Sequence, residues 1–115
     1  MDAFLVPADD VADKHLAKDF EKIAGIKGEP GEIEVLERKL KVQRRAPGVI
    51  WFDFETLCGG NRSQNDYLEI AREHHTLILS RVPKMSAAMA SEARRFTWLV
   101  DVLYDHRVKL LVSAE

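Results

Sequence analysis

The sequence has 115 residues, and its 17 basic and 19 acidic side chains leave a net charge of −2, which indicates neither a nucleic-acid partner nor an acidic membrane surface. The only cysteine, Cys58, excludes an internal disulfide and a multi-thiolate zinc site, and is typical of a cytoplasmic protein. No apolar run reaches the roughly 20 residues that span a bilayer, so no integral membrane segment is expected.

The N-terminal part, residues 1–31, is predicted to form a helix and a loop. Apolar residues, among them Leu16 and Phe20, recur at helical spacing within 9–24. Asp9 or Asp10 can cap the start of this helix, and a loop rich in Gly and Pro follows it.

Residues 32–45 alternate between apolar and charged side chains, which predicts a β-hairpin. Ile33 and Val35 would share a face of the first strand, and Leu40 and Val42 a face of the second. We expect the chain to reverse near 37–39, although no Asn-Gly pair marks the turn.

The remaining residues, 48–114, alternate between apolar runs and helical patterns. Ser63 is a suitable N-cap for the first of two long helices. Two consecutive crossovers favour a parallel sheet. We therefore predict an α/β fold, with a parallel three-stranded βαβαβ unit preceded by the helix and the hairpin. The whole chain, 1–115, would form a single incomplete domain, with strands near 49–54, 76–82 and 108–114.

The last strand–helix–strand has the outline of a P-loop ATPase without its functional groups. Ser80 and Arg81 stand where carboxylates would hold Mg²⁺, and no GxxxxGK[ST] motif occurs. We therefore expect no metal site and no ATP binding or hydrolysis by this chain alone.

Five stretches occur in an order that resembles the C-terminal half of the ZapE family: "WFDFETLC", "SQNDYLEIA", "HTLILSRVP", "EARRFTWLVDVLYD" and "VKLLVSA". These proteins are AAA+-type P-loop ATPases of bacteria with mitochondrial relatives. The hairpin "EVLERKLKVQRRA" is similar more loosely, since Glu37 stands where the family often has glycine.

This resemblance implies that the chain is a fragment of an ATPase that uses ATP and Mg²⁺. The nucleotide motifs would precede it, and the last strand, with a further segment missing behind it, would have an apolar edge open to self-association. It also implies a role in cell division with the polymerising protein FtsZ as partner. Mitochondrial relatives are linked to protein quality control instead, and an oligomer is possible.

Arg94 and Arg95 are the candidate phosphate-contacting residues of the parent, because a late arginine of an AAA+ domain can reach a γ-phosphate. The competing interpretation, which we favour because most basic residues are solvated, is a surface pair in which Arg94 stacks on Trp98.

Three aspartates also allow both a functional and a structural interpretation. Asp53 ends a strand of the parallel sheet and could either face a ligand or cap the turn that follows. Asp101 and Asp105 lie on the last helix, where a salt bridge from Asp105 to Arg107 or Lys109, or a buried hydrogen bond to a neighbouring loop, is the favoured account.

The predicted hairpin is locally basic, which supports an alternative function as a non-enzymatic protein-interaction module. An acidic partner could dock on it, although a solvated sheet edge protected by lysines is the favoured explanation. The candidate partner-binding residues are Arg38, Lys39, Lys41, Arg44 and Arg45.

Overall fold

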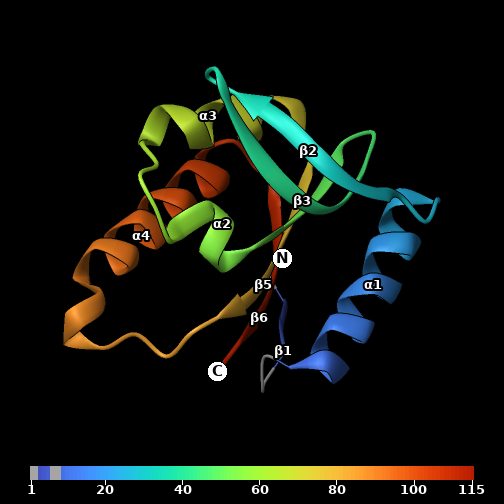
Figure 1. Ribbon diagram of the computed structural model, residues 1–115. Coiled ribbons are helices and arrows are strands. Elements are labelled where there is room, and N and C mark those ends of the chain that lie inside the picture. The colour runs from blue at the N-terminus through green and yellow to red at the C-terminus, as the bar shows by residue number, and fades with distance from the viewer. Residues whose placement is uncertain (1–2, 6–8) are drawn as a thin grey trace.

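The computed structural model describes residues 3–5 and 9–115, with side chains from residue 9 onward, and contains a six-stranded sheet with helices on both faces (Figure 1). The elements in chain order are β1 (Ala3–Leu5), α1 (Asp10–Ala24), β2 (Glu29–Val35), β3 (Arg38–Ala46), β4 (Val49–Asp53), α2 (Phe54–Cys58), α3 (Gln64–Glu73), β5 (Thr76–Val82), the 3-10 helix η1 (Ala87–Met89), α4 (Ala90–Asp105) and β6 (Lys109–Ala114).

The strand order is β1-β6-β5-β4-β3-β2. Strands β4, β5, β6 and β1 run parallel, whereas β3 and β2 are antiparallel additions beyond β4. The mixed α/β class is confirmed. Strand β1 was not predicted, and it pairs with β6 from Ala3↔Leu111 to Leu5↔Ser113. The expectation of an open apolar edge on β6 is therefore wrong, because β6 is an interior strand.

The sheet buries a different apolar cluster on each face. Helix α1 covers one face and packs Leu16 and Phe20 against Val49, Trp51 and Ile78. Helices α2, α3 and α4 cover the other face, where the larger cluster lies. Because successive strand residues point to opposite faces, β4, which is packed on both sides, is apolar throughout its first four residues.

The helix ends follow the capping residues of the sequence. The side chain of Asp9 accepts a hydrogen bond from the N–H of Ala12 at 3.0 Å, and Gly25 ends α1 with a φ of 76°. Ser63 and Asp66 form a capping box at the start of α3. The predicted helices at 9–24 and after Ser63 are thus confirmed.

The hairpin turns one residue earlier than predicted. Leu36 and Glu37 are its two loop residues, and both have positive φ angles, 49° and 68°. Positive φ at both central positions defines the tight turn that matches the twist of paired strands. A two-residue loop therefore forms here without the glycine that usually favours it.

Strand β3 also contains a bulge. Between the pairs Gly31↔Val42 and Glu29↔Arg45, β3 has one residue more than β2. Such an insertion shifts the alternation of side chains. Val42 consequently belongs to the large cluster, whereas Arg44 reaches α1 on the opposite face.

Candidate functional site

The carboxyl edge of the parallel strands is the usual ligand-binding edge of an α/β sheet. Here it is formed by Asp53 on β4, Ser80 and Arg81 on β5, and Ser113 on β6. Both serines are buried and already bonded within the protein. Ser80 Oγ accepts a hydrogen bond from Trp51 Nε1 at 3.0 Å, and Ser113 Oγ accepts one from the Arg81 N–H at 2.9 Å.

Arg81 lies in a bulge at the end of β5. Its φ is 59°, and β5 has one residue more than β6 between the pairs Leu79↔Val112 and Val82↔Ala114. The guanidinium turns toward α1, where Nη2 contacts Asp10 at 2.7 Å and Asp13 at 2.8 Å. Arg81 thus joins the sheet to α1, a contact that could not be predicted from the sequence because its partners lie 68 or more residues away.

Asp53 is the carboxylate that β4 places at this edge. It occupies the N-cap position of α2 without a capping hydrogen bond from its side chain. Burial raises the pKa of Asp53 above its ordinary value, and a hydrogen bond from the Phe54 N–H and the positive charge of Arg81 oppose part of that rise. The capping interpretation is therefore not supported, and Asp53 remains a half-buried acid beside a cation.

These residues do not fit Mg²⁺ with a nucleotide phosphate. Mg²⁺ takes oxygen ligands and is usually held by one or two carboxylates together with the phosphates. The edge offers one half-buried carboxylate, two engaged hydroxyls and an arginine bound to α1. Within residues 9–115, no group of three or more His, Cys, Asp or Glu side chains could hold a metal ion.

Arg94 and Arg95 lie on α4 in different surroundings. Arg94 is exposed. Arg95 is largely buried, its Nε donates to the main-chain carbonyl of Cys58 at 2.7 Å, and Nη2 lies 3.9 Å from Glu92. The contact with Cys58 connects α4 to the end of α2. Whether either arginine contacts a phosphate stays a prediction.

Two smaller expectations on α4 are not met. Asp101 and Asp105 are exposed, and within the described residues Asp105 forms no salt bridge to Arg107 or Lys109. Among the described residues, a cation–π contact joins Arg44 of β3 to Trp51 of β4 at 5.9 Å, and none joins Arg94 to Trp98.

Cys58 is a structural residue. It is fully buried, and burial raises the pKa of its thiol to about 11. The neighbouring Tyr67 hydroxyl donates to the carbonyl of Leu57 at 2.8 Å, and burial raises the pKa of this phenol as well.

The basic residues of the hairpin are largely offset by acids. Arg38 Nη2 contacts both carboxylate oxygens of Asp66, at 2.6 and 2.7 Å, and Arg44 Nη1 lies 3.3 Å from Glu21. Lys39, Lys41 and Arg45 remain exposed. The sheet order also shows that the expectation of a lysine-protected edge is wrong, because β3 is interior and the edge strand is β2.

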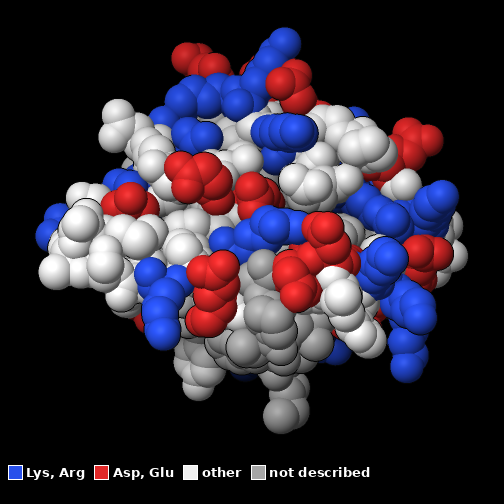
Figure 2. All heavy atoms as spheres, turned by 60° about the horizontal axis from the view of Figure 1, so that its bottom comes forward, with Lys and Arg blue, Asp and Glu red and all other residues white. Residues whose placement is uncertain are grey.

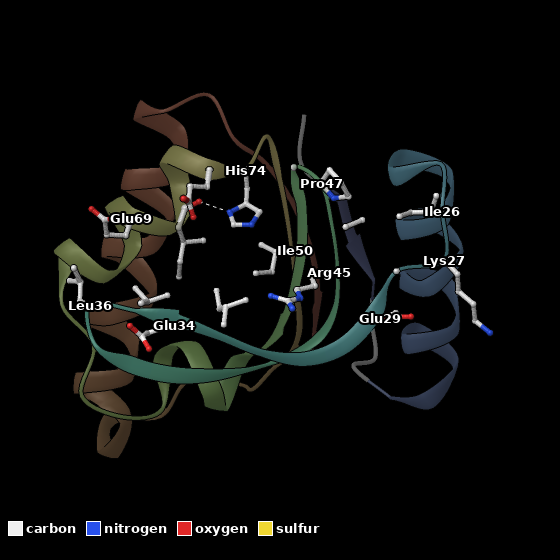
Figure 3. Close-up of a pocket in the computed structure, with 17 residues that line it drawn as sticks. Ile26, Lys27, Glu29, Glu34, Leu36, Arg45, Pro47, Ile50, Glu69 and His74 are labelled. Atoms are coloured by element: carbon white, nitrogen blue, oxygen red, sulfur yellow. Dashed lines mark hydrogen bonds between the residues drawn. The ribbon is translucent and has the colours of Figure 1, made fainter.

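A hollow of about 930 Å³ opens beside the hairpin. It lies between β2, the β3–β4 turn, the end of α3 and the loop after α1, at the amino end of the parallel strands (Figure 3). Arg45 and His74 point into it on either side of Ile50. His74 Nδ1 is 2.6 Å from the carbonyl of Ile70, so this nitrogen donates and Nε2 faces away from the bond.

The face seen in Figure 2 carries acidic and basic side chains side by side, without a large patch of one sign over its described part. None of the helices among the described residues is both long and apolar enough to cross a membrane.

The sequence model of the family described as AFG1-like ATPase matches residues 1–115. The chain belongs to the AFG1-like ATPase family. It is 40% identical over 113 residues to the cell division protein ZapE of Escherichia coli strain K12, covering 97% of this chain and 30% of that protein. Two eukaryotic relatives match over shorter regions. An uncharacterized Schizosaccharomyces pombe protein, C115.02c, is 42% identical over 84 residues (73% of this chain, 18% of that protein), and lactation elevated protein 1 homolog B of Danio rerio is 35% identical over 86 residues (75% and 17%).

The resemblance to ZapE proteins, inferred from the ordered motifs, is thereby confirmed. The chain spans less than a third of the length of these curated relatives. Among solved structures, none matches it significantly. The sequence did not indicate the hollow beside the hairpin, because its lining comes from four separate segments.

Proposed function

We propose that this chain is the C-terminal portion of an ATP-binding, ATP-hydrolysing AAA+-type protein of the ZapE kind. Its parallel strands and their helices would belong to a P-loop NTPase domain, and the residues that bind ATP and Mg²⁺ would lie in other parts of the parent. The match to ZapE over 97% of this chain but 30% of that protein carries the proposal.

The chain's own residues would then support the domain without performing its chemistry. The sequence has no phosphate-binding loop, and the carboxyl edge of the described strands has no set of acids for Mg²⁺. In the parent, ATP and Mg²⁺ would supply the phosphoryl chemistry. Arg95, fixed at Cys58, or the exposed Arg94 would be the groups available to contact a phosphate.

The biological setting follows from the relatives. Since ZapE is named a cell division protein, we propose a role of the parent in bacterial cell division, in the cytoplasm, with FtsZ as the partner that the resemblance implies. The alternative function is a non-enzymatic module with a basic docking surface. Arg38 and Arg44 are paired internally, so only Lys39, Lys41 and Arg45 of the candidate residues would be available to bind a partner.

Calorimetric titration of the 115-residue chain with MgATP tests the proposal that the ATP-binding residues lie in other parts of the parent. We expect no affinity stronger than about millimolar, because no phosphate cradle is present. The full-length parent, titrated in parallel, should bind and hydrolyse ATP. Micromolar binding by the short chain would contradict the proposal.

Arg95→Ala in the full-length parent tests the arginines, with Arg94→Ala as the matched variant on the exposed side of α4. A phosphate-contacting arginine acts on the transition state, so turnover should fall more than ATP affinity. Equal losses, or none, would leave Arg95 with its contact to Cys58 as its sole role.

A further inference from the structure

Strand β2 lies at the edge of the sheet and pairs with β3 on one side only. In an antiparallel ladder, residues alternate between those bonded to the partner strand and those whose main chain faces away. Counting from the two-residue loop, Val35↔Arg38 is a bonded pair and Glu34↔Lys39 is not. The main-chain N–H and C=O groups of Glu32 and Glu34 therefore face outward, where another strand could bind them.

The side chains of β2 carry one sign of charge. Glu29, Glu32 and Glu34 lie opposite cations of β3, in the pairs Glu29↔Arg45, Glu32↔Lys41 and Glu34↔Lys39. Opposite charges directly across a ladder attract, and like charges repel. On its open side, each glutamate has no cation from a neighbouring strand, so this edge favours a basic strand.

The other face of β2 adjoins the hollow, whose lining combines apolar side chains with charged ones, among them Glu29 and Arg45. Val35 is buried, Ile33 is partly buried, and both line the hollow together with Ile70. Ile26 and Leu36 also line it and are 53% and 48% exposed, so two of the large exposed apolar side chains of the described chain flank one depression. Apolar side chains of a strand bound at β2 would have space and contacts there.

We propose that β2 is a docking edge for an extended segment of a partner protein in which basic and apolar residues alternate. Strand β3 shows the pattern that suits β2, since Lys39 and Lys41 meet glutamates while Leu40 and Val42 enter the core. A second strand of this kind would continue the sheet, with main-chain bonds for affinity and alternate side chains for specificity. The basic hairpin predicted an acidic partner, whereas β2 favours a basic one. The proposal does not depend on nucleotide binding.

A second copy of this chain fits the edge poorly. Two β2 strands paired antiparallel about Ile33 would place Glu32 of each copy opposite Glu34 of the other, and the edge charges would repel. A helix in the hollow would leave the outward main-chain groups of Glu32 and Glu34 unused. The extended basic segment uses the outward main-chain groups, the glutamates and the apolar side chains that line the hollow together.

The probe is a capped heptapeptide, Lys-Leu-Lys-Val-Lys-Val-Lys, with a rearranged peptide of the same composition, Lys-Lys-Lys-Lys-Leu-Val-Val, as its control. We expect the alternating peptide to bind the 115-residue chain with Kd on the order of 0.1 mM, because a short strand adds few main-chain bonds. Amide hydrogen exchange should slow at Glu32 and Glu34. Equal binding of both peptides, or protection at Glu73 and His74 without protection of β2, would overturn the proposal.

Charge reversal provides the matched variants. Glu32→Lys combined with Glu34→Lys should weaken binding of the alternating peptide at least about tenfold. Asp101→Lys with Asp105→Lys, the same charge change on the exposed face of α4, should leave it unchanged. If the reversed chain fails to fold, Glu32→Gln with Glu34→Gln should show a smaller loss. If the β2 variants bind the alternating peptide as well as the α4 variant does, the proposed docking of a basic strand at β2 is wrong. A dimer of the free chain in sedimentation would also contradict it.

Discussion

The hairpin and the parallel strands are held in the sheet by different means. In β4 four of five residues are buried, whereas in β2 only Val35 is buried and most of the strand is exposed. The parallel strands are fixed by apolar burial on both faces. The hairpin depends on a short turn, on cross-strand charges and on Arg38 and Arg44, which reach outside it. Apolar burial thus contributes most to the parallel region, whereas the hairpin relies more on polar contacts.

The largest expected effect is on the parallel side. Phe52→Ala, at a fully buried position of β4, should lower the free energy of unfolding by about 3–5 kcal/mol, because it removes buried apolar surface and leaves a cavity. Ile33→Ala in β2 should cost about 1 kcal/mol, since its side chain is partly exposed. Urea titrations followed by circular dichroism measure both. Similar losses would show that the hairpin is as tightly packed as the centre.

The next effect concerns the ion pair that fixes the hairpin to α3. Arg38→Ala should cost about 1–3 kcal/mol, because it removes the guanidinium from the buried carboxylate of Asp66 and leaves that acid only the hydrogen bonds from Ser63. Arg72→Ala breaks an exposed pair with Glu69 of similar length and should cost about 0.5 kcal/mol or less.

Chemical denaturation of the Arg38→Ala and Arg72→Ala variants compares the loss of unfolding free energy at a buried carboxylate with the loss at an exposed one. Neutralising the acid as well, in Arg38→Ala with Asp66→Asn, should recover part of the loss, because no unpaired charge then stays buried. An Arg38 variant as stable as the Arg72 variant would contradict a structural role of this pair.

The parallel region was predictable because its signals are local. Apolar runs marked β4, β5 and β6, and Asp9 and Ser63 marked the helix starts. The missed features depend on distant parts of the chain. Strand β1 is only three residues long and is defined by pairing with residues more than 100 positions later. The position of β2 at the edge depends on which strand of the hairpin meets β4.

The candidate site was predictable to a smaller extent. The absence of a phosphate-binding loop motif was evident from the sequence, and the order of the motifs indicated the family. The acidic partner of Arg38 lies 28 residues away in the sequence, and those of Arg81 lie 68 or more residues away. The sequence therefore shows how many charges there are but not which of them form ion pairs. The same basic residues therefore suggested a docking surface that the acids of β2, α1 and α3 largely neutralise.

A smaller effect is expected at the hairpin turn. Glu37 has a φ of 68°, which costs a residue with a Cβ about 1–2 kcal/mol. Glu37→Gly should raise the free energy of unfolding by about 0.5 kcal/mol, since the greater freedom of glycine in the unfolded chain offsets part of the relief. Glu37→Ala, which removes the side chain but keeps the Cβ, should bring no gain. Thermal unfolding of both variants distinguishes backbone relief from loss of charge.

The smallest effect belongs to Asp53, the charged exception in β4. Its pKa is raised in the folded protein because burial disfavours the carboxylate, so the native state holds the proton more tightly than the unfolded chain does. Stability is then lost as the pH rises from the unfolded value of 3.8 through the raised one. The asparagine side chain of the Asp53→Asn variant cannot ionise. The free energy of unfolding of this variant, relative to that of the unsubstituted chain, should therefore be greater at pH 7 than at pH 3.5. Urea titrations at the two pH values, with Asp101→Asn as the exposed control, measure this difference. A relative stability that falls toward pH 7 would mean that the Phe54 hydrogen bond and the attraction of Arg81 together outweigh burial.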